Sequence, residues 1–317
     1  MKGKKPNFIF YVENFVRYIY PKFLCRLMTK RILSSVEKRE DFDYIFDRVN
    51  YYNKLDTNFS LENDGVKIKN FTFFPKTKSA YFFDTYEYVR FFPDSCKFSF
   101  VFGDVTHIPP VPSIVKSRPV AGDNRNSVVL NLDKLRHFVF IKDKIPFDEK
   151  DNKIIFYAAM NGKPHRMDFM KKYFGHPECI CGDITGHASI PKEWFVKKIS
   201  IKKHLTHKFI LALEGNDVAT NLKWIMSSNS LAVMPKPKYE TWFMEGRLIP
   251  DFHYVEIKDD YSNLIERMNY YIENPAEAKK IIKNANEYIS QFQNKKREKI
   301  IALMVLQKYF SKVLTQE

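Results

Sequence analysis

Cysteine, glycine and long apolar runs are all scarce in this chain. Its 317 residues include four cysteines, Cys25, Cys96, Cys179 and Cys181, which are too few and too scattered for a disulfide framework and indicate a reducing compartment. Ten glycines and no low-complexity tract argue against a fibrous or linker-rich protein. No run reaches the roughly 18–20 apolar residues of a membrane span, and the N-terminus lacks the features of a signal peptide. We therefore expect a cytoplasmic protein.

Acidic residues are also in short supply, since 37 Asp and Glu oppose 52 Lys and Arg and leave a net charge of +15. Residues 1–40 hold ten of the basic residues, three acids and many interleaved aromatic and aliphatic side chains. Such a segment suits the surface of an anionic bilayer. The alternative to membrane binding is a helix that packs on the core and turns its basic face to water. The segment also suits nucleic acid, although the chain has no recognisable nucleic-acid-binding module.

Residues 208–234 carry the clearest local pattern. An apolar run at 209–213 ends in Glu-Gly-Asn-Asp, a second segment covers 220–226, and a third apolar run covers 230–234. This order predicts a strand, a tight turn, a helix and a strand, which together form a βαβ element of a parallel sheet. Its turn and helix start offer free N–H groups to a phosphate, and Lys223 lies one turn further on. The glycine spacing fits neither a Walker loop nor a dinucleotide-binding loop.

The rest of the chain predicts an α/β protein with two domains, because its length suffices for two cores and strand-like runs alternate with helical ones. The apolar share of 44% and the aromatic share of 16% exclude a disordered chain. A polar cluster at 148–153 marks the boundary, which gives domains 1–150 and 151–317. Strand-like runs cover 71–74, 80–86, 98–104, 127–132, 138–141, 154–159 and 253–257, and helical patterns cover 165–174, 262–272, the segment after Pro275, and 296–314.

Several segments resemble glycosyltransferase family 90. EGND (214–217), NLKW (221–224) and SNS (228–230) look like its C-terminal signature. VFGDVTHIPPVPSIVKSRPV (101–120) is similar to the stretch that carries its catalytic aspartate, and YETWFMEGRLIPDFHYVEI (239–257) is similar to its bacterial branch. The family includes bacterial lipopolysaccharide-core transferases and eukaryotic protein O-glucosyltransferases, and the resemblance spans about residues 98–290.

The resemblance implies a GT-B-like fold, in which two Rossmann-like α/β domains face each other across a cleft. The first domain would serve the acceptor, the second would bind the nucleotide sugar, and the last helix would pack back on the first domain. The implied activity is an inverting, metal-independent transfer from a UDP-sugar to a hydroxyl of a lipopolysaccharide or lipooligosaccharide core. The UDP-sugar is a co-substrate, and no other cofactor, metal or nucleic acid is expected. The protein would lie on the inner face of the cytoplasmic membrane, where its lipid-linked acceptor is found.

Asp104 is the candidate catalytic base. It follows a strand and Gly103, and the reaction needs a group that takes the proton from the acceptor hydroxyl. Its alternative role is to cap the turn toward Thr106. The family-like segments KSRP and LRHF add Lys116, Arg118 and His137 as acceptor-side candidates, for which a surface loop and a packed histidine are the alternatives.

The departing diphosphate needs cations or oriented dipoles, and the family-like segments supply the donor-site candidates. One departure from the family's pattern is Ala158-Ala159, which stands where the family has Arg-Gly. This change leaves open a protein that binds sugar nucleotides without turnover. For Trp242, the alternative to donor binding is a structural role in the hydrophobic core. The predicted donor-binding residues are Asn161, Gly162, Arg166, Asp217, Thr220, Asn221, Lys223, Glu240, Trp242 and Glu245.

One cluster of potential zinc ligands is not expected to bind a metal. His176, Cys179, Cys181, Asp183 and His187 lie within twelve residues. Cys-x-Cys is not a usual zinc spacing, however, and no second Cys/His pair follows. The pair of acids at 259–260 fits a solvated turn before a helix.

Overall fold

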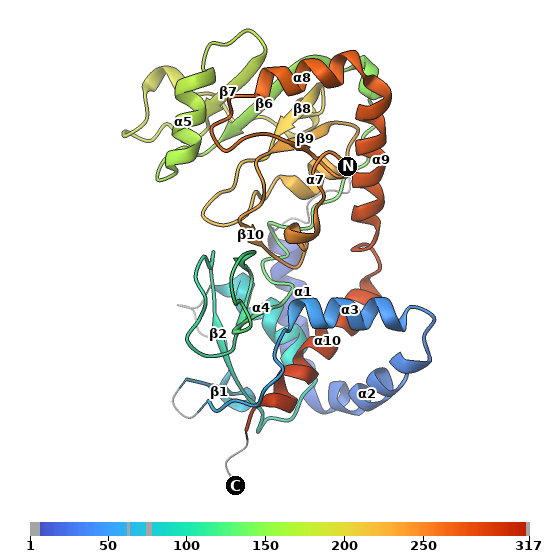
Figure 1. Cartoon of the computed structure of the whole chain (residues 1–317). Coiled ribbons are helices and arrows are strands. Elements are labelled where there is room, and N and C mark those ends of the chain that lie inside the picture. Colours follow the sequence, from blue (N-terminus) through green and yellow to red (C-terminus); the bar gives the residue numbers. More distant parts are fainter. Residues whose placement is uncertain (1–6, 62–63, 74–77, 315–317) are drawn as a thin grey trace. The chain divides into compact units, whose positions relative to one another are not determined.

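The computed structural model describes residues 7–61, 64–73 and 78–314, and the chain forms two compact units (Figure 1). Unit 1 comprises Phe138–Pro237 and Gly246–Gln291. Unit 2 comprises the described residues up to His137, the segment Lys238–Glu245 and the described residues from Phe292 onward. Each unit therefore combines segments that are far apart in the sequence.

Unit 1 is built on a five-stranded sheet in which every pairing of neighbouring strands is parallel. The two strands of the predicted βαβ element are buried along their whole length, as expected for parallel strands covered on both faces. In sheet order, the strands are β11 (Val255–Glu256), β9 (Leu231–Met234), β8 (His207–Leu211), β6 (Asp151–Ala158) and β7 (Cys179–Asp183).

The helices of unit 1 follow its strands along the chain. Prolines occupy the first turns of α5 and α9, where the missing N–H costs nothing. Helix α9 buries Ile281, Ile282, Ala285 and Ile289 on one face, as its spacing predicts. The helices are α5 (Pro164–Tyr173), α6 (Ile201–His204), α7 (Leu222–Met226), α8 (Leu264–Glu273) and α9 (Pro275–Ser290).

The strand order of unit 1 contains a reversal point. From β6 the chain continues to β7 on one side, whereas from β8 it continues to β9 on the other side. The connections that leave β6 and β8 therefore diverge, and we refer to the region beyond the carboxyl ends of these two strands as the crevice expected at such a point. Open parallel sheets bind their ligands at such a point.

Unit 2 contains a four-stranded sheet, a short two-stranded ladder and a set of helices. The strands β2, β3 and β5 are mutually parallel, and β1 pairs antiparallel with β2. No helix within the described ranges has the length and apolar content that a bilayer-spanning segment requires. The elements are β1 (Val66–Lys67), β2 (Lys97–Val101), β3 (Ser113–Val115), β5 (Ser127–Val129), the ladder of β4 (Arg118–Pro119) with β10 (Tyr239–Glu240), and α1 (Asn7–Ile19), α2 (Lys22–Ser34), α3 (Phe42–Tyr52), α4 (Ser79–Val89) and α10 (Lys295–Lys312).

A buried polar cluster joins the three segments of unit 2. Arg48 of α3 donates to both carboxylate oxygens of Glu298 of α10, at 2.5 and 3.0 Å. The indole Nε1 of Trp242 donates to the same carboxylate at 2.6 Å, and its ring stacks on Tyr52 with 3.9 Å between centroids. A buried charge is tolerated only when it is paired and hydrogen-bonded, so these contacts hold α3, α10 and residues 238–245 in one unit.

Most predicted elements are confirmed. The segment 208–234 forms β8, α7 and β9, and the predicted strand at 154–159 and the helices at 165–174, 262–272 and 296–314 correspond to β6, α5, α8 and α10. The strand-like interpretation of 80–86 is wrong, since these residues lie in α4. Residues 71–73 and 138–141 also form no strand, and residue 74 lies outside the described ranges. Because α4 is buried on nearly every side, its apolar run lacks the polar face that reveals a helix.

Candidate active site

Asp104 lies in the loop after β2, at the carboxyl edge of the sheet of unit 2. Gly103 before it has a φ of 127°, a conformation that side-chain-bearing residues rarely adopt. The side chain of Asp104 is 23% exposed, and its Oδ1 accepts a hydrogen bond from Lys116 Nζ at 2.5 Å. Arg136 lies 3.7 Å from the same oxygen. The carboxylate is thus partly exposed and flanked by two cationic side chains.

The loop that carries Asp104 is fixed to the end of the neighbouring strand. The Ser117 hydroxyl accepts a hydrogen bond from the N–H of Val105 and donates one to its carbonyl, both at 3.0 Å. Lys116, in the same segment after β3, is only 2% exposed. One serine and one lysine therefore hold the acid in place.

A second acid completes this cluster from the loop after β5. Asp133 adopts a φ of 59° and accepts a hydrogen bond from Arg136 Nε at 2.7 Å. Arg136 therefore bridges Asp133 and Asp104, and its bond to Asp133 raises the pKa of the guanidinium further. Tyr81 lies 3.5 Å from Asp133, and burial raises the pKa of this tyrosine to about 12, so it is a neutral hydroxyl.

The acceptor-side candidates differ in their surroundings. Lys116 contacts Asp104, as described, and His137 is buried with its Nε2 at 3.9 Å from the Asp133 carboxylate. Arg118 is fully buried and donates to Glu240 at 2.7 Å and to the carbonyl of Tyr51 at 2.7 Å. Lys116 and His137 thus lie in the Asp104 cluster, whereas the contacts of Arg118 are those of a structural residue. Direct acceptor contact by any of them stays a prediction.

Three donor-site candidates lie in the 238–245 segment of unit 2, and all three are buried. Glu240 pairs with Arg118, and Trp242 stacks on Tyr52. Glu245 accepts hydrogen bonds from the backbone N–H and the hydroxyl of Thr241, at 2.6 and 3.0 Å. These contacts fit the core role that the sequence left open for Trp242. Recognition of ribose or sugar by these residues stays a prediction without support from their surroundings.

Arg166, at the start of α5, lies at the reversal point of unit 1. Its guanidinium donates to the carbonyl of Ala159, at 3.0 Å, and to the carbonyls of Leu213 and Glu214, at 2.8 and 2.9 Å. It thereby ties the loop after β6 to the loop after β8. Burial lowers the pKa of this arginine to about 10, which still leaves it charged at neutral pH. No carboxylate pairs with it in the described structure, so its charge is available to an anion.

The loop between β6 and α5 carries the candidates Asn161 and Gly162. Both are exposed, and Gly162 has a φ of 68°, which favours glycine in this turn. Asn161 accepts a hydrogen bond from Ser189 at 3.2 Å. Asp183, at the end of β7, holds the loop by accepting from the N–H of Met160 at 2.9 Å. These residues border the same crevice as Arg166.

The turn after β8 carries the remaining candidates. Helix α7 begins at Leu222 and has five residues, so it starts later than predicted and offers little dipole to a phosphate. Asn221 donates from its side chain to the carbonyl of Leu211 at 3.0 Å. Asp217 and Lys223 are buried, and Thr220 is exposed. The segment therefore lies at the crevice, but Arg166 is the better-placed cation for a diphosphate.

The region weighed as a zinc site forms β7 and the loop after it. Burial raises the pKa of the Cys179 thiol to about 12 and that of Cys181 to about 11, whereas zinc binds thiolates. Asp183 is occupied with loop N–H groups and Thr185. Across the described ranges, no three His, Cys, Asp or Glu side chains form a group that could hold a metal ion.

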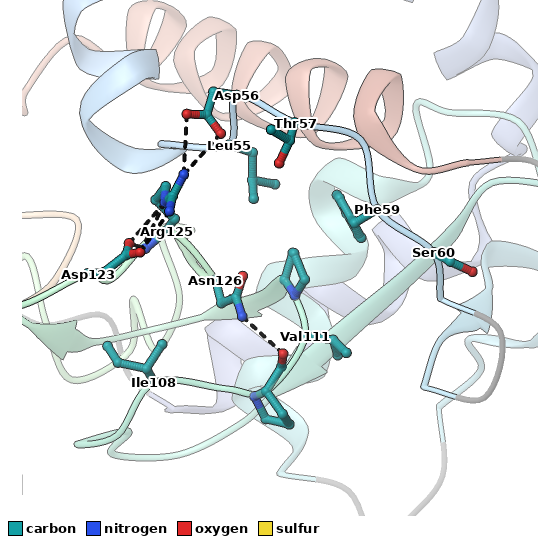
Figure 2. A pocket seen from close by; sticks show the side chains of 12 residues that line it. Leu55, Asp56, Thr57, Phe59, Ser60, Ile108, Val111, Asp123, Arg125 and Asn126 are labelled. Carbon is teal, nitrogen blue, oxygen red and sulfur yellow. Dashed lines mark hydrogen bonds and ion pairs between the residues drawn. The ribbon is translucent and has the colours of Figure 1, made fainter.

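A cavity of about 460 Å³ opens at the other edge of the sheet of unit 2 (Figure 2). Its residues Pro112 and Asn126 precede β3 and β5, whereas Asp104 and Lys116 follow the strand ends. Figure 2 shows Arg125 between the carboxylates of Asp56 and Asp123 at its rim. The cavity is therefore separate from the Asp104 cluster.

Sequence reasoning missed several residues that shape these two clusters. In unit 2 they are Asp133 and Tyr81, and in unit 1 they are Asp183 and His165, whose ring nitrogen contacts the carbonyl of Glu214 at 2.8 Å. Asp183 carried a usable signal, since a polar side chain at the end of a parallel strand lies at the ligand-binding edge.

Comparisons with known proteins agree with a sugar-transferring enzyme. The chain matches the model of Glycosyl transferase family 90 over residues 131–317. It is 44% identical to the O-glucosyltransferase LpsA of Dichelobacter nodosus over 268 residues, which cover 84% of this chain and 83% of that protein. It is also 26% identical to the human Protein O-glucosyltransferase 3 over 159 residues, 49% of this chain and 31% of that protein. With its two clusters at parallel-strand ends, the chain is a glycosyltransferase and belongs to glycosyltransferase family 90.

Proposed function

We propose that this enzyme transfers glucose from UDP-glucose to a hydroxyl of a lipopolysaccharide or lipooligosaccharide core, with inversion at the anomeric carbon. The similarity to the O-glucosyltransferase LpsA supports the sugar, and the likeness of residues 239–257 to the bacterial branch of the family is the basis for the acceptor class. The observation that carries the chemistry is the accessible Asp104 carboxylate between Lys116 and Arg136. A general base at the tip of a strand is what a single displacement at a sugar carbon requires.

In the proposed reaction, Asp104 accepts the proton of the acceptor hydroxyl. The hydroxyl oxygen forms a bond to the anomeric carbon while the bond from that carbon to the diphosphate oxygen breaks, and UDP leaves with the electron pair. Lys116 holds the Asp104 carboxylate by a hydrogen bond, and Ser117 fixes the loop that carries it. One displacement without a covalent intermediate inverts the anomeric configuration.

The donor is assigned to the crevice of unit 1. We infer that Arg166 provides the positive charge for the departing diphosphate, because burial without a carboxylate partner leaves that charge open to an anion. Asn161, Gly162 and Asn221 border the same strand ends. Buried cations and oriented N–H groups stabilise a leaving group strongly where water is excluded. The proposal uses no metal ion for this step.

The proposal also includes a GT-B-type division of labour, with the base in unit 2 and the donor in unit 1. Each unit has parallel strands whose carboxyl ends carry the assigned residues, which supports this division. The acceptor is proposed to be lipid-linked and the enzyme to work on the inner face of the cytoplasmic membrane. The exposed apolar residues of α1 and α2 support contact with a membrane. The basic residues 2, 4 and 5 of that segment lie outside the described residues.

A donor screen with purified enzyme tests the proposal. UDP release would be measured with UDP-glucose, UDP-galactose, UDP-xylose and UDP-N-acetylhexosamines, each with and without a lipopolysaccharide-core acceptor. We expect acceptor-dependent release with UDP-glucose above the other donors, and a product of inverted configuration by NMR. Binding of UDP-glucose without any release would instead favour a sugar-nucleotide binder without turnover, the alternative raised by Ala158 and Ala159.

A further inference from the structure

Exposed large apolar side chains are concentrated in one small part of unit 2. Eleven of them lie on α1, on α2 and at the junction of these helices, whereas eight are spread over the remainder of the described chain. Soluble proteins rarely leave such a concentration in water unless it contacts a partner or a membrane. We call this surface the α1–α2 outer face, and it consists of Phe8, Ile9, Tyr11, Val12, Phe15, Val16, Ile19, Tyr20, Phe23, Leu27 and Met28.

Helix α1 departs from the usual orientation, because it has apolar side chains on its outward side as well as on its inward side, where Phe10 is buried and Tyr18 packs on Phe82. A surface helix normally turns its apolar stripe to the core and its polar side to water. In α1, Asn14 is buried, and Arg17 on the same side pairs with Glu87 of α4 at 2.7 Å. The outward stripe holds Phe8, Phe15 and Ile19, which are 77%, 55% and 66% exposed. The side of α1 that faces away from the protein is therefore apolar, although the inward side already has apolar contacts of its own.

Helix α2 continues the same arrangement. Its residues Phe23 and Leu27 are 60% and 71% exposed, and Arg31 follows at the same four-residue spacing. On the inward side, Lys22 and Arg26 both contact Asp94, at 3.3 and 2.6 Å. Lys30 and Arg31 are also exposed. The exposed side of α2 is therefore apolar near the start of the helix and cationic near its end.

The structure changes the role of the basic residues in this segment. The sequence predicted a basic, aromatic-rich segment that suits an anionic bilayer, but Arg17, Lys22 and Arg26 pair with acids of unit 2 and attach the helices to it. The apolar side chains are what remains for an outside partner. Hydrophobic contact should therefore contribute more to binding than charge.

We propose that the α1–α2 outer face inserts into the interfacial layer of an anionic lipid bilayer, with both helices lying in the membrane plane. Phe8, Phe15, Phe23 and Leu27 enter the acyl boundary, and Lys30 and Arg31 contact lipid phosphates. Amphipathic helices with aromatic residues and terminal cations bind in this way. A bilayer suits the face better than a second copy of the chain, because copies with a net charge of +15 repel each other. The inference extends the proposed function by naming the surface that meets the membrane of the lipid-linked acceptor.

Vesicle flotation of the full chain tests this proposal. The vesicles contain phosphatidylethanolamine with phosphatidylglycerol, and vesicles of phosphatidylcholine alone form the comparison. We expect the double variant Phe15→Ser/Leu27→Ser to lose binding by a factor of about 10 or more, and Lys30→Glu/Arg31→Glu to lose less. The matched control is Phe195→Ser/Ile249→Ser, which removes apolar residues of 51% and 53% exposure from unit 1 and should bind as the wild type does.

Three outcomes would overturn the inference. The apolar variant could float as the wild type does, or added salt could abolish binding completely, which would make the contact purely electrostatic. Alternatively, the variant could convert a lipid-free oligomer to a monomer while vesicle binding stays unchanged, which would make the face a self-association surface. The melting temperature should equal that of the wild type, because the changed side chains are exposed.

The same variant separates this inference from the proposed function. UDP release with a soluble core oligosaccharide should be unchanged, since neither substituted residue belongs to the candidate active site. Loss of flotation with retained UDP release supports the membrane surface. If no donor yields UDP release, the proposed reaction fails while the flotation result still decides the surface.

Discussion

Unit 1 and unit 2 each place a charged candidate residue in the segment that follows a parallel strand, but they hold the key charge differently. In unit 2, Asp104 contacts the cationic side chains of Lys116 and Arg136. In unit 1, Arg166 contacts backbone carbonyls and, among the residues that the structure describes, no carboxylate. One unit therefore keeps an anion with cations nearby, and the other keeps a cation without an opposing charge.

This difference assigns the two chemical tasks. A carboxylate between cations stays ionised and can accept a proton. Backbone carbonyls orient a guanidinium without neutralising its charge. The guanidinium can therefore still attract an incoming diphosphate. Exchange of the roles would fit poorly, because the diphosphate would meet the carboxylate of Asp104 in unit 2.

The largest effect is expected at Asp104. Asp104→Asn keeps the shape but removes the proton acceptor, so kcat should fall by about 10²–10⁴-fold. The affinity of unit 1 for UDP, measured by calorimetry, should change by no more than a factor of about two. The base acts in the transfer step and is not needed for binding of the nucleotide. Substantial turnover by this variant would remove the assignment of the base to unit 2.

The next effect concerns stability and not catalysis. Glu240→Gln leaves the buried Arg118 without its ionic partner, and breaking a buried pair costs about 3–5 kcal/mol. Urea unfolding should show this loss, whereas the donor KM of the remaining folded enzyme should be unchanged. A raised donor KM with normal stability would instead return Glu240 to the donor site and break the division between the units.

Arg166 tests the charge in unit 1. In Arg166→Ala, three carbonyls lose their donor and the crevice loses its cation, so UDP affinity should fall by about 10–100-fold, the worth of one charge-assisted hydrogen bond. Arg166→Lys restores the charge without the planar fork, so it separates attraction from loop positioning. Unchanged UDP affinity in a folded alanine variant would contradict the assignment.

A substitution of Asp183 tests how much this residue stabilises the loops at the crevice of unit 1. Burial raises its pKa, but hydrogen bonds from Thr185, Met160 and Gly186 lower it more, and the net shift is downward. Its stabilisation is therefore fully present above the ordinary aspartate pKa of about 3.9 and is lost as pH falls through the lower folded value. Asp183→Asn should cost about 1–3 kcal/mol at neutral pH, and the difference from the wild type should shrink below about pH 4. A difference that is constant down to pH 3 would contradict this account.

The smallest effect is expected at the cavity of Figure 2. Arg125→Ala removes ion pairs with Asp56 and Asp123 that are at least half exposed, and exposed pairs contribute little. Neither the melting temperature nor kcat/KM should change measurably. A clear loss of kcat/KM for the core acceptor would show that this edge of unit 2 also handles substrate.

Local features of the site were readable from the sequence, whereas the partners of its residues were not. The strand, the glycine and the following acid at 98–104 predicted the place of Asp104, because strand ends and φ-permissive glycines depend on adjacent residues. The bridge from Arg136 to Asp133 and Asp104 was not predictable, since it joins loops after two different strands. The core role of Trp242 was only one of two options, because Tyr52 and Glu298 lie far from it in the sequence.

The sequence by itself determined the βαβ element at 208–234, the family resemblance and the strand-end acid, since these depend on short-range patterns of apolar residues, turns and motif letters. Only the tertiary structure decided which side of α1 and α2 is exposed, that Arg166 is held by three carbonyls, and that residues 238–245 belong to unit 2. The physical reason is that burial and pairing depend on contacts between distant segments. Periodicity within a segment shows that a helix has two faces, but the packing of other segments determines which face water reaches.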